Sequence, residues 1–183
     1  MLFRSVNGLK FSPDGLHLAY VAERDGKELV VVDSTEGPAY HEIMPGTPIF
    51  SPDSRRVAYA ADAAEGFVAV ADGRAGKAYE GIIQGTLTFS PDGAHVAYGA
   101  RRGDAYFVVV DGAEGDDYDG FVKDSELGWD SPTELHALVT RYGADLLMVN
   151  GKWLSKDEKM AWSNEIVRAE ISLEPGAPAP KKH

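Results

Sequence analysis

The sequence predicts an all-β fold assembled from tandem copies of one four-stranded unit, and three observations lead to that prediction. The chain has 183 residues, 44% of them apolar, which suffices for one ordinary domain with a core. Phe-Ser-Pro-Asp begins at positions 11, 50 and 89, so the repeat has a period of 39 residues. Each unit carries short apolar runs separated by turn-forming residues. Four antiparallel strands in about 40 residues are typical of a β-propeller blade.

Further landmarks recur with the same period and without a gap. They are Ala-Tyr from positions 19, 58 and 97, Asp at 33, 72 and 111, Gly at 37, 76 and 115, and Tyr at 40, 79 and 118. A fourth, degenerate copy of the repeat follows, with Trp129 and Ser131-Pro132 near the positions where Phe and Ser-Pro are expected. Asn150-Gly151 stands one full period after Asp111-Gly112. The pattern excludes a helical solenoid.

The strands of one unit can be placed from its turns. In the second unit we expect residues 47–51 as a first strand, which ends in a turn at Pro52-Asp53 because proline presets its own backbone angle. Residues 57–61 and 67–72 are expected as the second and third strands. Residues 79–83, short and of mixed polarity, are expected as a fourth strand at the outer edge.

These units give one β-propeller domain over residues 1–174, with repeats near 7–45, 46–84, 85–124 and 125–159. Residues 1–6 stand in the register of a lone fourth strand. We therefore expect them to pair with residues 160–174 in a composite fifth blade that closes the ring. The alternative is an amphipathic helix that begins near Ser155–Glu158, extends to about Glu170 and caps an incomplete array. The proline-rich residues 175–183 are expected to form a flexible tail.

The recurring Phe-Ser-Pro-Asp-Gly, followed by Ala-Tyr, resembles the WD40-like repeat of bacterial β-propellers. Repeats of this type occur in TolB proteins and in the propeller domains of prolyl-oligopeptidase-like enzymes. The resemblance covers about residues 2–151 and implies a fold rather than a function, because such blades serve unrelated roles. The pattern departs from the eukaryotic WD40 repeat: there is no Gly-His pair, and Trp129-Asp130 lies at the start of a unit.

TolB-like proteins are exported and carry a further N-terminal domain, whereas here the repeats begin directly after Met1. The chain as written is therefore expected in the cytoplasm, and in the periplasm or outside the cell if it is truncated at its N-terminus.

The composition of the chain disfavours several classes of binding partner. The chain has 18 Lys and Arg against 29 Asp and Glu, and its formal net charge of -11 disfavours nucleic acid and anionic lipid. The longest apolar run, Ala105 to Val110, is far below the roughly 18 residues of a membrane-spanning helix. With no cysteine there is no disulfide, thiolate zinc site or cysteine nucleophile. A protein is the expected partner, and the chain is expected to be a monomer if the ring closes.

The histidines are not expected to be ligands or bases. His17 and His95 share one repeat position with Arg56 and, in the degenerate unit, His136. One such residue per blade predicts an exposed strand position, because metal ligands and general bases must converge. His41 is isolated, and His183 lies in the tail.

The serines and aspartates of the repeat are expected to form turns. Ser12, Ser51 and Ser90 precede proline and lack a Gly-x-Ser-x-Gly context, so they are expected to cap turns rather than attack a substrate. Asp33, Asp72 and Asp111 are expected to lie apart, one per blade, so they do not form an acid-base pair.

Two further groups of side chains recur or cluster. Residues 111–120 hold five acidic residues in a glycine-rich connection with no basic neighbour, which predicts a solvated loop and leaves a cation site such as calcium open. The aromatic series is expected to pack between blades rather than to stack on sugars. Its members are Phe11, Phe50, Phe89, Tyr20, Tyr59 and Tyr98.

The sequence thus assigns no catalytic, cofactor-binding or metal-ligating residue. The favoured function is a non-enzymatic propeller scaffold for protein-protein interaction. The alternative is a fragment or accessory, gating propeller domain of a larger protein such as a prolyl-oligopeptidase-like hydrolase.

Overall fold

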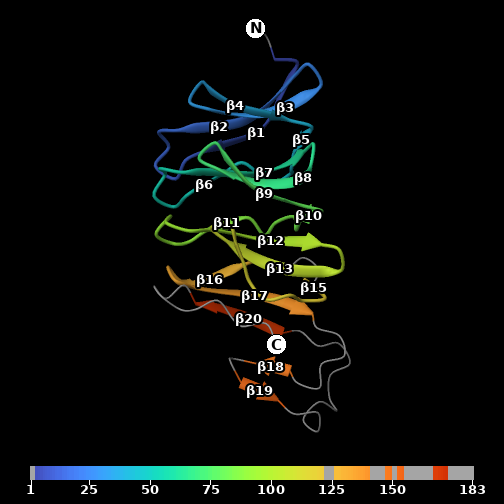
Figure 1. Cartoon of the computed structure of the whole chain (residues 1–183). Helices are drawn as coiled ribbons and strands as arrows, with labels where there is room; N and C mark the ends of the chain where they lie inside the picture. Colours follow the sequence, from blue (N-terminus) through green and yellow to red (C-terminus); the bar gives the residue numbers. More distant parts are fainter. Residues whose placement is uncertain (1–2, 122–125, 141–146, 150–151, 155–166, 173–183) are drawn as a thin grey trace.

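The computed structural model describes residues 3–121, 126–140, 147–149, 152–154 and 167–172. Its antiparallel sheets follow one another in chain order and lie stacked face to face, from the first sheet in blue to the fourth in orange (Figure 1). Apolar side chains on both faces of the inner sheets form the core between neighbouring sheets. The predicted all-β, propeller-like architecture of repeated sheets is confirmed.

The first three sheets share one plan, in which the strands are added in chain order from one edge to the other. The first sheet consists of β1 (Ser5–Phe11), β2 (Leu18–Arg24), β3 (Lys27–Val32) and β4 (Thr35–Tyr40). The second consists of β5 (Glu42–Ile43), β6 (Ile49–Phe50), β7 (Val57–Ala63), β8 (Gly66–Ala71) and β9 (Arg74–Tyr79). The third consists of β10 (Gly81–Ile82), β11 (Thr88–Phe89), β12 (Val96–Arg102), β13 (Ala105–Val110) and β14 (Ala113–Glu114).

The prediction for the fourth strand is wrong in its position. The outer edge of the second blade was assigned to residues 79–83, but the outer strand is β9, which ends at Tyr79. Gly81 and Ile82 instead pair with Arg101 and Ala100 and begin the inner edge of the third sheet. The error arises because β9 is rich in glycine, alanine and charge, so it lacks the apolar alternation of a strand.

The same correction applies to the N-terminus. Ser5 and Val6 pair with Glu23 and Ala22 of β2, so they belong to the inner strand of the first sheet and are not a spare fourth strand. Phe3 nevertheless packs edge-on against Tyr20 at 6.4 Å between ring centroids, as Tyr40 does against Tyr59 and Tyr79 against Tyr98 at 6.1 Å. The described residues show no composite fifth blade, and Met1, Leu2 and most of residues 160–174 lie outside the description.

The fourth sheet departs from the plan. It contains β15 (Gly120–Phe121), β16 (Gly128–Ser131), β17 (Glu134–Thr140) and β20 (Val167–Ser172), and β20 pairs with β17 where the other sheets have their third strand. β18 (Leu147–Val149) and β19 (Lys152–Leu154) pair only with each other among the described strands. The alternative helix to Glu170 is wrong from residue 167 onwards, because that segment is β20. Residues 155–166 lie outside the described part.

The Ser-Pro-Asp turns are built by one hydrogen-bond pattern, which explains why the motif recurs. The buried Ser51 hydroxyl donates to Asp53 Oδ1 (2.5 Å) and accepts from the Arg56 amide (2.9 Å). Ser12 with Asp14, and Ser90 with Asp92, repeat this arrangement. The serines therefore cap turns, as expected.

Candidate functional site

An open groove of about 610 Å³ lies between the second and third sheets. Ala69 and Ala71 of β8 and Ala75 and Gly76 of β9 line it from the second sheet, and Val96 and Tyr98 of β12 line it from the third. Its remaining lining residues are polar or lie in the strand turns: Arg56, Asp72, Arg74, Asp111 and Gly112. A volume of this size lies within the range of pockets that hold small ligands or peptide side chains.

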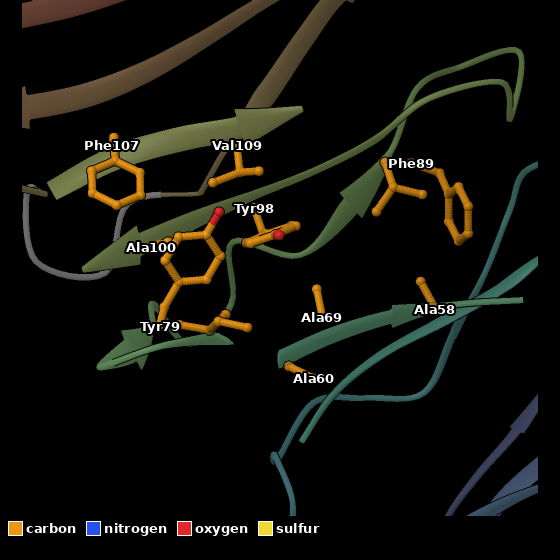
Figure 2. Packing of buried hydrophobic residues seen from close by; sticks show 11 residues of the cluster. Ala58, Ala60, Ala69, Tyr79, Phe89, Tyr98, Ala100, Phe107 and Val109 are labelled. Atoms are coloured by element: carbon orange, nitrogen blue, oxygen red, sulfur yellow. The ribbon is translucent and has the colours of Figure 1, made fainter. Parts of the chain in front are cut away.

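The groove exists because the second unit has smaller side chains than its neighbours at three positions. Ala69 stands where the first and third units have Val30 and Val108, and Ala71 where they have Val32 and Val110. Ala75 stands where they have Glu36 and Glu114. Figure 2 shows Ala58, Ala60 and Ala69 of the second sheet facing the larger Phe89 and Tyr98 of the third. The missing side-chain volume leaves the groove open at the end of β8.

The first and third sheets each carry an Arg–Glu ion pair at a position where the second sheet has two alanines. In the first sheet Arg24 donates two hydrogen bonds to Glu36, at 3.0 and 2.7 Å. In the third sheet Arg102 does the same to Glu114, at 3.0 and 2.9 Å. The second unit has Ala63 and Ala75 at these two positions, so both partners are exchanged together.

Arg56 fixes one wall of the groove. Its Nε donates to Asp72 Oδ2 (2.8 Å), and its Nη1 donates to the carbonyl oxygens of Gly93 (3.0 Å) and Ala94 (2.6 Å) in the third sheet. Its guanidinium also lies 5.3 Å from the ring centre of Phe89. A histidine at this position cannot make four such contacts, so the change from His17 and His95 to Arg56 ties the two sheets together beside the groove.

The charges of the groove are unevenly compensated. Asp72 is paired with Arg56, and Asp111 shares a hydrogen bond with His95 Nδ1 at 2.6 Å. Arg74 is exposed, and its guanidinium has no hydrogen-bond or ion-pair partner among the residues that the structure describes. The first and third units have Thr35 and Ala113 in its place. The groove therefore offers one uncompensated cation above a floor of alanines.

Tyr98 supplies a neutral hydroxyl at the floor. The residue is 4% exposed, and burial is the main cause that raises the pKa of its hydroxyl well above the usual value. Tyr98 is therefore protonated at any physiological pH. It is therefore not a base.

The sequence-predicted positions are not brought together into one site. Each basic residue of the shared position pairs with the aspartate of its own sheet: His17 with Asp33 (2.5 Å), Arg56 with Asp72, and His95 with Asp111. His136 pairs instead with Asp130 (2.8 Å). Asp33, Asp72 and Asp111 have φ between 46° and 51°, as expected for residues that form the hairpin turns. Sequence reasoning missed this pairing, although the two positions recur at one constant separation in all three units.

The acidic loop has basic neighbours from other strands, although its own sequence contains none. Glu114 accepts hydrogen bonds from Arg102 of the third sheet and from Lys77 Nζ (2.5 Å) of the second sheet. Arg102 first and Lys77 second hold the pKa of Glu114 down to about 2. No three histidine, aspartate or glutamate side chains gather as metal ligands in the described part of the chain. Within the same part, no helix has the length and apolar character to span a membrane.

The chain is similar to known proteins in its structure. No protein-family model matches the chain, and no curated protein matches it. The β-propeller domain of the Trilobed protease from Pyrococcus furiosus matches with a TM-score of 0.54 and 12% identity, over 84% of this chain and 57% of that one. The chain has a propeller-type fold. The β-propeller domain of Cps50 (Swd1) from Myceliophteria thermophila matches with a TM-score of 0.42 and 12% identity, over 75% and 48% of the two chains.

The chain spans about half the length of these propeller domains. The protease domain is described as having an open velcro topology. At this level of identity the likeness concerns the fold alone.

Proposed function

We propose that the protein is a non-enzymatic β-propeller scaffold that binds a protein partner, and that the groove between the second and third sheets holds a segment of that partner. The observation behind this proposal is that Ala69, Ala71 and Ala75 of the second unit stand where the first and third units both have valine, valine and glutamate. A repeat whose only task was to pack against its neighbours would keep the larger side chains found in the units on both sides.

The way in which the polar groups are used favours binding over catalysis. Asp72 and Asp111 are held by Arg56 and His95, and Tyr98 is protonated. Ser51 and Ser90 are hydrogen-bonded within their turns. Among the described lining residues, no nucleophile stands beside a base that could activate it.

The groove fits an extended peptide segment with a small or medium apolar side chain and a carboxylate. The alanines at 69, 71 and 75 form a floor that an apolar side chain can fill. Arg74 at the rim lacks an ion-pair partner among the described residues and can receive the carboxylate. The adjacent strand, β9, is the outer strand of its sheet, so an extended segment has a free edge beside it.

The test is selection of peptides from a random display library on the purified chain, followed by binding isotherms. The double variant Ala69→Val with Ala71→Val fills the groove with the valines that the neighbouring units carry at these positions. The variant Arg74→Thr replaces the cation with the residue that the first unit has there. We expect selected peptides to lose at least tenfold in affinity for each variant, whereas Ala113→Val on the exposed β14 is a control that retains it. Peptides that bind all variants equally well would contradict the groove as the binding site.

A second candidate is an accessory propeller domain of a larger enzyme. The specific observation in its favour is the match to the propeller domain of a protease, of which this chain spans 57%. A reading frame that continues into a Gly-x-Ser-x-Gly hydrolase domain would support this candidate, and stop codons close on both sides would count against it.

A further inference from the structure

Two of the side chains that line the groove are carboxylates, and their charges are compensated in different ways. Asp72 of the second sheet accepts a hydrogen bond from Arg56 Nε at 2.8 Å. Asp111 of the third sheet shares a hydrogen bond with His95 Nδ1 at 2.6 Å. The two pairs occupy equivalent positions in the repeat. Arginine is always charged, whereas histidine is the side chain that changes its charge between about pH 5 and 8.

The imidazole of His95 can keep its contacts in both charge states. A neutral ring can carry its proton on Nδ1 and donate it to Asp111, so this hydrogen bond does not require a positive charge. The ring also lies nearly parallel to that of Trp129 in the fourth sheet, with 6.4 Å between the ring centroids and 22° between the planes. The His95 side chain is 31% exposed, so it can exchange a proton with solvent. Protonation therefore changes the charge beside the groove without breaking the contact with Asp111.

The other charged groups on the described elements around His95 are bonded to residues of their own sheets. These groups and their partners are Arg56 with Asp72, Asp92 with Ser90, and Asp130 with His136. Arg56 also donates to two main-chain carbonyls in the turn directly before His95. His136 is titratable as well, but it is not among the residues that line the groove. His95 is therefore the titratable cation that acts on the carboxylate of Asp111.

On the basis of the peptide-binding role proposed for the groove, we propose that His95 makes the binding of an acidic segment depend on pH. When His95 is neutral, the charge of Asp111 is uncompensated and opposes a carboxylate held by Arg74. When His95 is protonated, it compensates Asp111, and Arg74 is left as the net positive charge of the lining. The segment therefore binds more tightly in mildly acidic than in mildly alkaline solution. In the second sheet Arg56 gives Asp72 the same compensation at every pH.

The experiment measures the dissociation constant of one selected peptide that contains an acidic residue, between about pH 5.5 and 8, where the carboxylates of the peptide stay ionised. The side chains of His95 and Asp111 are 31% and 48% exposed, so solvent and salt screen their charges. We therefore expect the wild type to bind about two- to fivefold more weakly at the alkaline end. Added salt should reduce this difference, because it screens the charges further.

Two variants of His95 fix its charge in opposite ways. His95→Arg supplies the permanent cation that the second sheet has at this position, so it should bind at every pH as the wild type does at the acidic end. His95→Gln is uncharged, so it should bind at every pH as the wild type does at the alkaline end. The matched controls are His17→Gln, at the same repeat position of the first sheet, and His136→Gln in the fourth sheet. Both should keep the pH dependence of the wild type.

Two results would overturn the role of His95 and leave the groove as the binding site. One is a wild-type affinity that does not change with pH, and the other is a pH dependence that survives in His95→Gln. In both cases Ala69→Val with Ala71→Val would still weaken binding. A peptide that binds this filled groove as tightly as the wild type would instead overturn the proposed function, and the role of His95 with it.

Discussion

Replacing Glu114 by glutamine should destabilise the protein, because the carboxylate of Glu114 is held by two cations from two sheets. Its carboxylate accepts two hydrogen bonds from Arg102 and one from Lys77, and so connects the second and third sheets. These contacts lower its pKa from 4.5 to about 2, a difference that corresponds to at most roughly 3 kcal/mol. Because the Lys77 side chain is 56% exposed and salt screens the pair, we expect Glu114→Gln to lower the free energy of unfolding by about 2 kcal/mol at pH 7.

The assay is reversible urea unfolding of wild type and variant at several pH values. A carboxyl group with a depressed pKa in the folded state contributes stability that is fully present above pH 4.5 and is lost as the pH falls towards 2. The difference between the two proteins should therefore shrink over that window and vanish below it. At neutral pH it should lower the melting temperature by about 4–8 °C.

Glu36→Gln is the matched control. Glu36 accepts the same two hydrogen bonds from Arg24, and no lysine of a neighbouring sheet is among the ion pairs of its carboxylate in the described part of the chain. The Glu36→Gln variant should therefore lose less free energy of unfolding than Glu114→Gln. A loss of less than about 0.5 kcal/mol in the Glu114→Gln variant, or an equal loss at pH 7 and pH 2, would contradict a stabilising role of the Glu114 carboxylate.

Three further outcomes follow from the contacts described above. Ser51→Ala should lower the free energy of unfolding by about 1–3 kcal/mol, because it leaves the Arg56 amide and Asp53 without their buried partner. Urea unfolding measures this loss, and a loss near zero would contradict the capping role of Ser51. Asp72→Val should be more destabilising than Asp72→Asn, because valine tolerates a φ of 51° poorly, and equal unfolding midpoints would argue against a strained turn. NMR titration should place the pKa of His17 above 6.5, chiefly because of its hydrogen bond to Asp33, and Asp33→Asn should lower that pKa. The stabilisation by this pair is present below pH 6.5 and is lost as the pH rises through the raised pKa of His17. An unshifted pKa of His17 would exclude the pair.

The sequence predicted the repeat and the turns because these depend on local chemistry. Ser-Pro-Asp builds its turn from hydrogen bonds between near neighbours in the chain, and Asp72 takes a positive φ next to Gly73. β9 was missed because an edge strand needs no apolar face, so the sequence Arg-Ala-Gly-Lys-Ala-Tyr carries little signal for a strand.

The groove could be predicted only in part. The exchange of Arg and Glu for Ala63 and Ala75 is visible when the three units are aligned, and so is the constant separation of the basic residue from its aspartate. Whether lost volume at Ala69 and Ala71 leaves a groove or lets the sheets close up depends on Arg56, whose contacts with the third sheet fix that sheet in place. Those contacts cross between units and have no signature in either one alone.

We propose that the smaller side chains of the second unit create a peptide-binding groove. The most direct measurement is the dissociation constant of one selected peptide for three proteins: wild type, Ala69→Val with Ala71→Val, and Ala113→Val. We expect equal affinity for wild type and Ala113→Val, within about twofold, and at least tenfold weaker binding, about 1.4 kcal/mol, when the groove is filled. Equal affinity for all three proteins would contradict the claim.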